Sequence, residues 1–397
     1  MSNILPDVVR LTEKLVSLES VTGKEALVGD YLTAYCREQG LTVEKQYCTD
    51  IRFNVLISYG GLPAKDEAYG LLLHGHMDTV PKLDMNNPFI PILDEDYLYG
   101  RGTVDQKGGL AAAVTALISL KKRGIQLEKP VCVAAVIDEE SEHRGTMKLV
   151  ESGIRAEAAV ITEPSNLRAV VGCKGTLPLK LTVKGKAAHG CRPWLGVNAV
   201  QKALPLLQGL FDIEFPSHSY DDVPGTLMNS VNVGIVQAGT AYNNVPDSCE
   251  ISLDCRISPG ETVEGMRERI DQVIQTAREK DPDLQVQVSI ARPDWNWEPI
   301  KERGLKPARI STSDSFIKLV EKTHKEIIGK QVEFYITDGY AEIDFMLNDL
   351  HIPCVLYGPG EPRLCHTAEE RISLNQLQKA VEVYERIIER QCGVVKE

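Results

Sequence analysis

The sequence lacks the features that would place the protein in a membrane or in an oxidising compartment. Its 397 residues contain ten cysteines, but no CxxC pair and no regular cysteine spacing. No apolar run approaches the length of a membrane span. The N-terminal segment MSNILPDVVRLTEKLVS has neither the basic start nor the cleavage site of a signal peptide. We therefore expect a cytoplasmic protein with free, buried thiols.

Basic residues are also fewer than acidic residues. The chain has 44 Lys and Arg residues against 56 Asp and Glu residues, which gives a formal net charge of −12. An acidic surface repels nucleic acids and anionic membranes, so we expect neither as a partner. With 43% hydrophobic residues, the composition is otherwise ordinary, and a chain of this length is long enough for two domains.

Short apolar runs alternate with amphipathic segments in both the first and the last part of the chain. Continuous apolar runs are typical of strands that are buried on both faces. They predict an α/β domain in which helices cover a mostly parallel sheet, with a long last helix capped by Ser373. The predicted strands are residues 54–58, 70–74, 131–137, 158–162 and 353–357.

The middle of the chain follows a different pattern, in which strands alternate apolar and polar residues. The order β-α-β-β-α-β predicts a ferredoxin-like α+β domain, inserted at residues 177–292 between two parts of a catalytic domain, 1–176 and 293–397. The predicted elements are strand 177–183, helix 197–210, strands 231–236 and 249–256, helix 262–279 and strand 284–290.

Histidines and carboxylates follow the ends of four predicted strands, and one more carboxylate lies on a glycine-bounded loop. In open α/β sheets, catalytic groups gather at the carboxyl ends of strands. Two histidines and three carboxylates fit two zinc-like ions that share one bridging carboxylate and a water. Taken singly, His76 is equally typical of a polar residue where a strand leaves the core, and three adjacent acids are ordinarily typical of a solvated loop. The residues are His76, Asp105, Glu140, Glu163 and His366, with Asp78 and Glu139 beside them.

Five motifs, HGHMDTVP, GRGTVDQKGG, DEE, ITEPS and CHTAEE, occur in this order. Together they resemble the dinuclear zinc family of acetylornithine deacetylase, succinyl-diaminopimelate desuccinylase, aminoacylase and glutamate carboxypeptidase, over essentially the whole chain. The resemblance implies a zinc-exopeptidase-like catalytic domain, an inserted lid and dimerisation domain, and a homodimer. It also implies two divalent metal ions, with zinc expected and cobalt or manganese as alternatives.

The resemblance assigns a role to each residue of the motifs. It implies Glu139 as the acid/base and Asp78 as the partner of His76. A water shared by two cations loses much of its proton affinity, so Glu139 would take its proton and pass it to the leaving amine. The implied ligands are His76 and Glu163 for one metal, Glu140 and His366 for the other, and Asp105 between them.

Further candidates come from the same resemblance. His189, otherwise typical of a surface loop, would stabilise the oxyanion as part of the lid. Asn244 and Arg256 would contact the substrate, and Arg256 suits a bidentate grip on a carboxylate, although a surface ion pair explains it equally well. Gly358 and Gly360 would offer backbone N–H groups to a substrate carboxylate, or simply turn the chain.

The segment TDGYAEIDF has no arginine where many relatives carry one. Its acids, Glu342 and Asp344, favour a substrate with a cationic side chain, or else lie on a helix surface. The predicted function is hydrolysis of the amide bond of an N-acyl amino acid, as in acetylornithine deacetylase. The alternatives are a di-/tripeptidase or carboxypeptidase acting on short peptides, a succinyl-diaminopimelate desuccinylase, and a binding protein that has lost catalysis.

Overall fold

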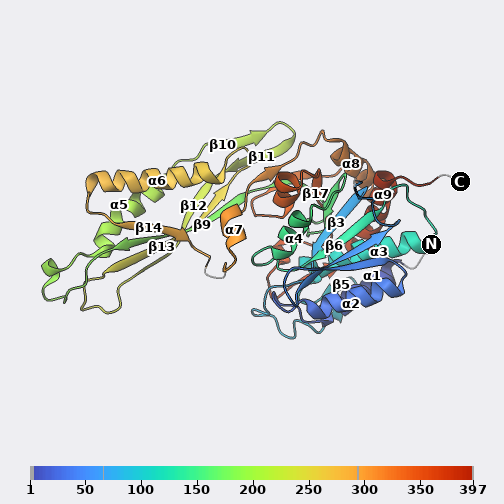
Figure 1. Ribbon diagram of the computed structural model, residues 1–397, viewed down its shortest axis with the longest axis horizontal. Helices are drawn as coiled ribbons and strands as arrows, with labels where there is room; N and C mark the ends of the chain where they lie inside the picture. Colours follow the sequence, from blue (N-terminus) through green and yellow to red (C-terminus); the bar gives the residue numbers. More distant parts are fainter. Residues whose placement is uncertain (1–3, 66, 293–294, 396–397) are drawn as a thin grey trace. The chain divides into compact units, whose positions relative to one another are not determined.

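The computed structural model describes residues 4–65, 67–292 and 295–395, and the chain divides into two compact units (Figure 1). Within the described ranges, no helix combines the length and the apolar character needed to cross a membrane. All ten cysteines are free thiols and most are buried. Unit 1 comprises Met1–Gly172, Arg309–Ile336 and Glu342–Glu397, and unit 2 comprises Cys173–Ala308 and Thr337–Ala341.

A mixed sheet forms the centre of unit 1. Its strands are β1 (Thr42–Tyr47), β2 (Phe53–Tyr59), β3 (Leu71–His76), β6 (Val131–Val136), β7 (Ala159–Ile161), β8 (Ala169–Cys173), β15 (Ala308–Arg309), β16 (Phe334–Thr337) and β17 (Cys354–Leu356). The order is β1-β2-β6-β3-β7-β17-β8-β15, and β16 also pairs with β8. The central pairs β6-β3, β3-β7 and β7-β17 are parallel, whereas β1-β2, β2-β6 and β17-β8 are antiparallel.

Helices cover this sheet. Every residue of β3 and β6 is buried, so both faces of the sheet are covered at its centre. Helices α3 and α9 pack on each other and on β3 (Figure 1). The helices of unit 1 are α1 (Ile4–Ser17), α2 (Ala26–Glu38), α3 (Gly108–Lys122), α4 (Arg144–Ser152), α8 (Ser315–Ile328) and α9 (Leu374–Cys392). Three short strands, β4 (Ile92–Leu93), β5 (Tyr97–Tyr99) and β18 (Arg371–Ser373), form a separate small sheet.

The predicted α/β architecture is confirmed, with parallel pairing at the centre of the sheet and antiparallel pairing toward its edges. The five predicted strands correspond to β2, β3, β6, β7 and β17. Strand β1, with the sequence TVEKQY, was not predicted because an edge strand keeps polar, partly exposed residues and shows no apolar run. Helix α9 begins directly after Ser373, but the Ser373 side chain makes no capping hydrogen bond.

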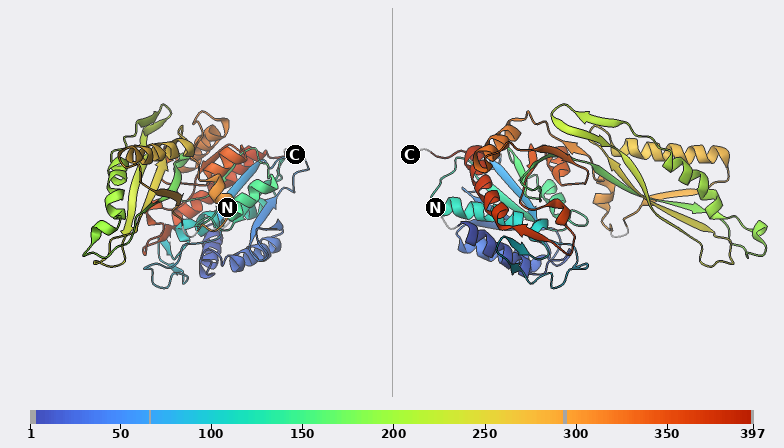
Figure 2. Two further views of the ribbon diagram at one scale, coloured as in Figure 1. Left: turned by 60° about the vertical axis from the view of Figure 1, so that its left-hand side comes forward. Right: turned by 180° about the vertical axis from the view of Figure 1, so that it is seen from behind.

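Unit 2 contains a four-stranded antiparallel sheet in the order β12-β13-β9-β14. Buried residues alternate along β9 and β13, and α5 and α6 lie side by side on the covered face (Figures 1 and 2). The elements of unit 2 are β9 (Gly175–Lys184), α5 (Ala199–Phe211), β10 (Ser217–Tyr220), β11 (Val223–Met228), β12 (Ser230–Ala238), β13 (Ser248–Ile257), α6 (Val263–Lys280), β14 (Val286–Ile290) and α7 (Glu298–Arg303). This is the predicted ferredoxin-like order, with the hairpin β10-β11 added between α5 and β12.

The boundaries of unit 2 lie outside the predicted range 177–292. The backbone N–H of Thr176 donates to the carbonyl of Leu305 at 2.9 Å, which ties the segment around α7 to the start of β9. The side chain of Lys174 also pairs with Asp338 at 2.7 Å. These contacts join residues far apart in the sequence, which a reading of local patterns does not detect.

Candidate metal and catalytic site

His76 is the last residue of β3 and is wholly buried. Its ring Nδ1 lies 2.9 Å from the backbone carbonyl oxygen of Asp78 and 3.5 Å from the Asp78 carboxylate. The carboxylate was the predicted partner, but the nearer oxygen belongs to the backbone. A ring nitrogen that donates to a fixed oxygen leaves the other nitrogen, Nε2, free to bind a metal.

Asp105 divides its two carboxylate oxygens between two histidines. Nε2 of His76 lies 3.1 Å from Asp105 Oδ1 and 3.2 Å from Glu163 Oε1. Nε2 of His366 lies 3.2 Å from Asp105 Oδ2 and 3.1 Å from Glu140 Oε2. The five residues predicted as ligands therefore lie together in unit 1, as two groups that share Asp105 and could each hold a metal ion.

Asp78 organises the segment that carries the two adjacent glutamates. Its carboxylate accepts the backbone N–H of Glu139 at 3.1 Å and that of Glu140 at 3.2 Å, and the hydroxyl of Thr22 at 2.8 Å. The two side chains then diverge. Glu140 points to His366, whereas Glu139 Oε2 lies 3.9 Å from Nε2 of His76. Glu139 is thus beside the ligands without being one of the closest donors.

Glu370 fixes the turn that presents Asp105. Asp105 lies in the irregular turn Thr103–Lys107, directly before α3. The buried Glu370 carboxylate accepts three backbone N–H groups from this turn, those of Gly102 at 2.9 Å, Val104 at 3.0 Å and Asp105 at 3.1 Å. Its second oxygen pairs with the buried guanidinium of Arg101 at 2.5 Å. Four donors therefore hold one carboxylate behind Asp105.

Gln106 holds the side chain of Glu163 in place, as Glu370 holds the turn of Asp105. Its side-chain amide donates to Glu163 Oε1, and its amide oxygen accepts the hydroxyl of Thr162 at 2.7 Å. Thr162 lies just after β7 and directly precedes Glu163. The orientation of Glu163 is therefore set by its own strand and by the turn that carries Asp105.

The electrostatics of the site favour positive charge. Burial lowers the pKa of His76, but Glu163, Asp105 and Asp78 outweigh burial and raise it well above the ordinary histidine value. Hydrogen bonds to Asp105 and Glu140 raise the pKa of His366 to about 10. Carboxylates that hold protons on two histidines so firmly would hold cations in the place of those protons.

Burial also acts on the carboxylates. Burial, together with the charge of Asp105, raises the pKa of Glu163 to about 7 against the opposing effects of His76 and Gln106. It raises the pKa of Glu139 well above the ordinary glutamate value, and the charges of Glu163, Glu342 and Glu140 add to this effect, whereas His76 opposes it. A carboxyl group with such a raised pKa is typical of a catalytic acid or base.

Glu342 and Asp344 are buried, with exposed fractions of 2% and 0%, so they do not lie on a helix surface. The Glu342 carboxylate lies 2.9 Å from Nδ1 of His143 and 3.4 Å from Nε2 of His74. It therefore faces two histidines of its own chain. The burial contradicts the helix-surface alternative, and a contact of Glu342 with a cationic substrate stays a prediction.

The predicted lid residues lie in unit 2. His189 and Asn244 are both exposed and face each other across an isolated antiparallel bridge. Nδ1 of His189 accepts the backbone N–H of Cys191 at 3.1 Å, which leaves Nε2 as its outward nitrogen. Arg256 lies on β13, and its Nε pairs with Asp254 at 3.0 Å, so its guanidinium has an ion-pair partner within the strand.

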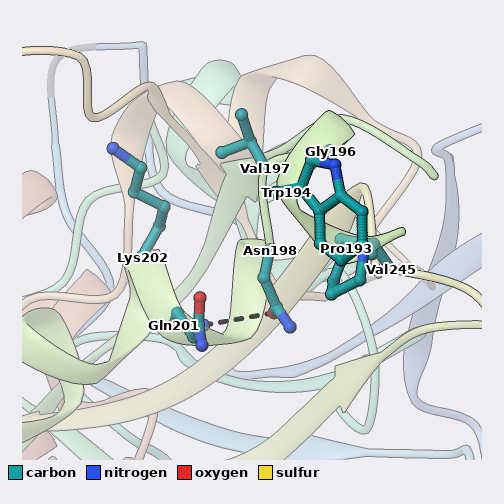
Figure 3. Close-up of a pocket in the computed structure, with 8 residues that line it drawn as sticks. All are labelled: Pro193, Trp194, Gly196, Val197, Asn198, Gln201, Lys202 and Val245. Carbon is teal, nitrogen blue, oxygen red and sulfur yellow. Dashed lines mark hydrogen bonds between the residues drawn. The ribbon is translucent and has the colours of Figure 1, made fainter. Parts of the chain in front are cut away.

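Unit 2 has a pocket that is lined mainly by residues shortly after His189 in the sequence (Figure 3). Its lining residues are Pro193, Trp194, Gly196, Val197, Asn198, Gln201, Lys202 and Val245. Asn198 caps α5 by accepting the N–H of Val200 and that of Gln201, and Lys202 pairs with Asp281. The pocket contains none of the predicted site residues, and its exposed Trp194 is its most prominent apolar group.

Gly358 and Gly360 are buried, and their N–H groups are already bonded within the chain. Gly358 donates to the hydroxyl of Ser165 at 3.0 Å, and Gly360 donates to the side chain of Gln376 at 2.7 Å. A Cβ on Gly358 would lie 2.4 Å from the carbonyl oxygen of Glu163. Close packing therefore explains Gly358, and neither glycine presents a free N–H group to a substrate.

Sequence reasoning missed the residues that orient the ligands. Glu370 belongs to the motif CHTAEE and Gln106 to GRGTVDQKGG, so both lie close to predicted ligands in the sequence. The available signal was a carboxylate or amide in a glycine-rich or loop context close to a ligand. Only the fold brings Glu370 to residues 102–105, more than 260 positions earlier in the chain.

Known relatives and solved structures resemble nearly the whole chain. A probable carboxypeptidase from Aspergillus clavatus is 28% identical over 395 residues, which cover 95% of this chain and 86% of that protein. The solved structure of a tripeptidase from Staphylococcus aureus has a TM-score of 0.77 at 20% identity and covers 98% of both chains. A metallo-carboxypeptidase from Sulfolobus solfataricus has a TM-score of 0.76 at 16% identity, covering 97% of this chain and 99% of that one. The model of peptidase family M20/M25/M40 matches residues 72–390, and this chain therefore belongs to that family.

Proposed function

We propose that the protein is a metallopeptidase that hydrolyses an amide bond of a short peptide with two divalent cations. The observation that carries the proposal is the division of the Asp105 oxygens between His76 and His366, with Glu139 beside them. The relatives named carboxypeptidase and tripeptidase favour a peptide substrate over the N-acyl amino acid predicted first. An acetylornithine-like deacylase stays the second candidate, since the same chemistry cleaves both kinds of bond.

The side chains present fit zinc-like cations. Imidazole nitrogens and carboxylate oxygens are ligands that zinc accepts, and cobalt or manganese is also compatible with them. Ligand atoms around one tetrahedral zinc ion lie about 3.3 Å apart, given zinc-to-ligand distances of about 2.0–2.1 Å. The separations of 3.1–3.2 Å within each group are close to that value. In the proposal, His76 and Glu163 hold one cation, Glu140 and His366 hold the other, and Asp105 bridges them.

The bound cations would supply Lewis acidity, which polarises the amide carbonyl and acidifies a water. Glu139 is proposed to accept the proton of that water and to deliver it to the nitrogen of the leaving amine. Its carboxylate lies 3.9 Å from Nε2 of His76, and its side chain is 18% exposed. Asp78 accepts the backbone N–H of Glu139 and so fixes the backbone that carries the proposed base.

Unit 2 is proposed to supply substrate contacts and the dimer interface. His189 and Asn244 are exposed polar neighbours, and they are suited to donate hydrogen bonds to a developing oxyanion when the site closes. Arg256 is the proposed contact for a substrate carboxylate, but it would first have to exchange its partner Asp254. We retain a homodimer and a cytoplasmic location as parts of the proposal.

A substrate screen tests the proposed function. The protein is loaded with zinc, cobalt or manganese and incubated with dipeptides, tripeptides and N-acyl amino acids that share the same C-terminal residue. The proposal predicts turnover of a peptide, with N-acetylornithine and N-succinyl-diaminopimelate cleaved more slowly. Faster cleavage of an N-acyl amino acid than of every matched peptide would replace the peptidase assignment with the deacylase.

A further inference from the structure

A third group of possible metal ligands lies beside Glu139, outside the ligands proposed above. Glu139, His143 and Glu342 each place one ligand atom within 4.8 Å of the other two. The side chains of His143 and Glu342 are 6% and 3% exposed, so these two donors are protected from bulk water. One imidazole and two carboxylates match the ligand types and number of a zinc site with an open position.

Two of these donors already lie close together, and the third is within reach of them. Nδ1 of His143 and Oε1 of Glu342 lie 2.9 Å apart, slightly less than the separation of about 3.3 Å between two ligands of a zinc ion. Glu139 has to approach the pair from within 4.8 Å, and glutamate has three rotatable side-chain bonds for this movement. Nε2 of His74 faces the second oxygen of Glu342 at 3.4 Å and also contacts the hydroxyl of Thr146 at 3.0 Å, so Glu342 is held in place.

The local charge leaves room for another cation. Six carboxylates lie in this region of unit 1: Asp78, Asp105, Glu139, Glu140, Glu163 and Glu342. Two divalent cations at the proposed catalytic positions would leave two of these six charges to be balanced by groups of the chain, and Glu342 already faces His74 and His143. A divalent ion bound there would add its charge directly between Glu139 and Glu342, where burial makes an uncompensated carboxylate costly.

We propose that Glu139, His143 and Glu342 form a third cation site, and that a divalent ion bound there inhibits the enzyme. Its affinity is lower than that of the two catalytic positions, because the 2.9 Å contact between His143 and Glu342 has to open and Glu139 has to move toward the ion. A Glu139 carboxylate that binds an ion cannot accept a proton from water. The inhibition rests on the proposed function, whereas the binding of the third ion does not.

Equilibrium dialysis against zinc chloride, followed by elemental analysis, tests the site in the full chain. The unsubstituted protein is compared with His143→Gln and Glu342→Gln, and with His324→Gln as the matched control. His324 is also a buried histidine with an oxygen partner, the hydroxyl of Tyr357 at 2.8 Å, but it belongs to none of the three ligand groups. Circular dichroism and the unfolding midpoint of each variant verify that it is folded.

We expect the unsubstituted protein and His324→Gln to bind a third zinc at higher free zinc, and each of the other two variants to bind only two. With a peptide substrate, saturation of the third site should lower the turnover of the unsubstituted protein about a hundredfold, the size of a lost general base, and should spare the two variants. A third zinc that is absent from the unsubstituted protein, or present in both variants, overturns the site. A third zinc that binds without loss of turnover overturns the inhibition. If no peptide is cleaved, the proposed function fails, and the zinc stoichiometry still decides whether the site exists.

Discussion

The carboxylate of Glu370 accepts the backbone N–H of Asp105 at 3.1 Å, so the residue that faces both His76 and His366 is held by a second, buried acid. Glu370 follows His366 by four residues in the sequence, so one segment carries both a histidine that contacts Asp105 and the support for Asp105. The position of Asp105 between the two histidines therefore depends on a contact that closes across the chain.

Replacing Glu370 by alanine should weaken metal binding. The turn that carries Asp105 would lose three hydrogen bonds and Arg101 would keep a buried, unpaired charge, which costs about 3–5 kcal/mol of stability. Loss of a residue that orients a ligand typically lowers metal affinity about 10- to 100-fold. Competition with a chromophoric chelator measures that affinity, and Glu370→Gln, which keeps an acceptor oxygen, should recover part of it.

Glu385→Ala is the matched control for this prediction. Glu385 is also buried and pairs with an arginine, Arg123 at 2.9 Å, but it lies on α9 and outside the ligand groups. This variant should lose stability while its metal affinity stays unchanged. Equal losses of metal affinity in Glu370→Ala and Glu385→Ala would show that Glu370 acts only through general stability.

Glu139→Gln should retain both metal ions and lose turnover. The amide cannot accept a proton from water, and a general base is worth roughly 10²–10⁴-fold in rate. Elemental analysis gives the metal content, and steady-state kinetics should show the loss in kcat rather than in KM. Glu140→Gln provides the contrast, because that change removes a proposed ligand and should lower the metal content. Retained turnover in Glu139→Gln would refute the assignment of the base.

Removal of the metals should abolish activity and lower stability together. A ligand present at about 100 times its Kd stabilises the folded state by about 2.7 kcal/mol per site. Dialysis against a chelator should therefore lower the unfolding midpoint, and zinc should restore both the midpoint and the activity. Calorimetry with and without zinc measures the shift. Activity that survives in the chelated protein would exclude a metal-dependent mechanism.

Gly358→Ala should disturb Glu163 through packing alone. The added Cβ would lie 2.4 Å from the carbonyl oxygen of Glu163 and 2.5 Å from that of Thr162, so backbone must move. Overpacking of this kind typically costs about 1–3 kcal/mol, and we expect weaker metal binding as well. Urea unfolding and chelator competition measure the two effects. At Gly234 the nearest atom to such a Cβ is 3.6 Å away, so Gly234→Ala should leave metal binding unchanged.

The stability of the metal-free protein should fall as the pH drops below about 6.5, in part because of His324. Burial lowers the pKa of this ring, so the folded state keeps it neutral after the unfolded state has bound a proton. The contribution of His324 is therefore fully present above the unfolded pKa and is lost as the pH falls toward the folded pKa. Urea unfolding at pH 7.5 and at pH 5.5 should show a smaller difference for His324→Gln than for the unsubstituted protein. An unchanged difference would show that His324 is not responsible.

Local patterns in the sequence predicted most of the fold because the strands of each unit have their own spacing of apolar residues. A strand buried on both faces, such as β6, carries apolar residues at every position, whereas β9 alternates because only one of its faces is covered. The edge strand β1 and the hairpin β10-β11 carry neither signature and were missed. The extent of unit 2 was also underestimated, because the contacts of Thr176 and Lys174 join distant segments.

The sequence by itself determined which side chains follow each strand. Because the parallel strands of a sheet end at one edge, this order was enough to predict that His76, Glu140 and Glu163 lie near one another. Only the tertiary structure decided that Asp105 faces two histidines at once, that Glu370 supports it, and that Glu342 is buried between His74 and His143. These contacts depend on how loops from different strands meet, and loop geometry is set by long-range packing rather than by the residues next in sequence.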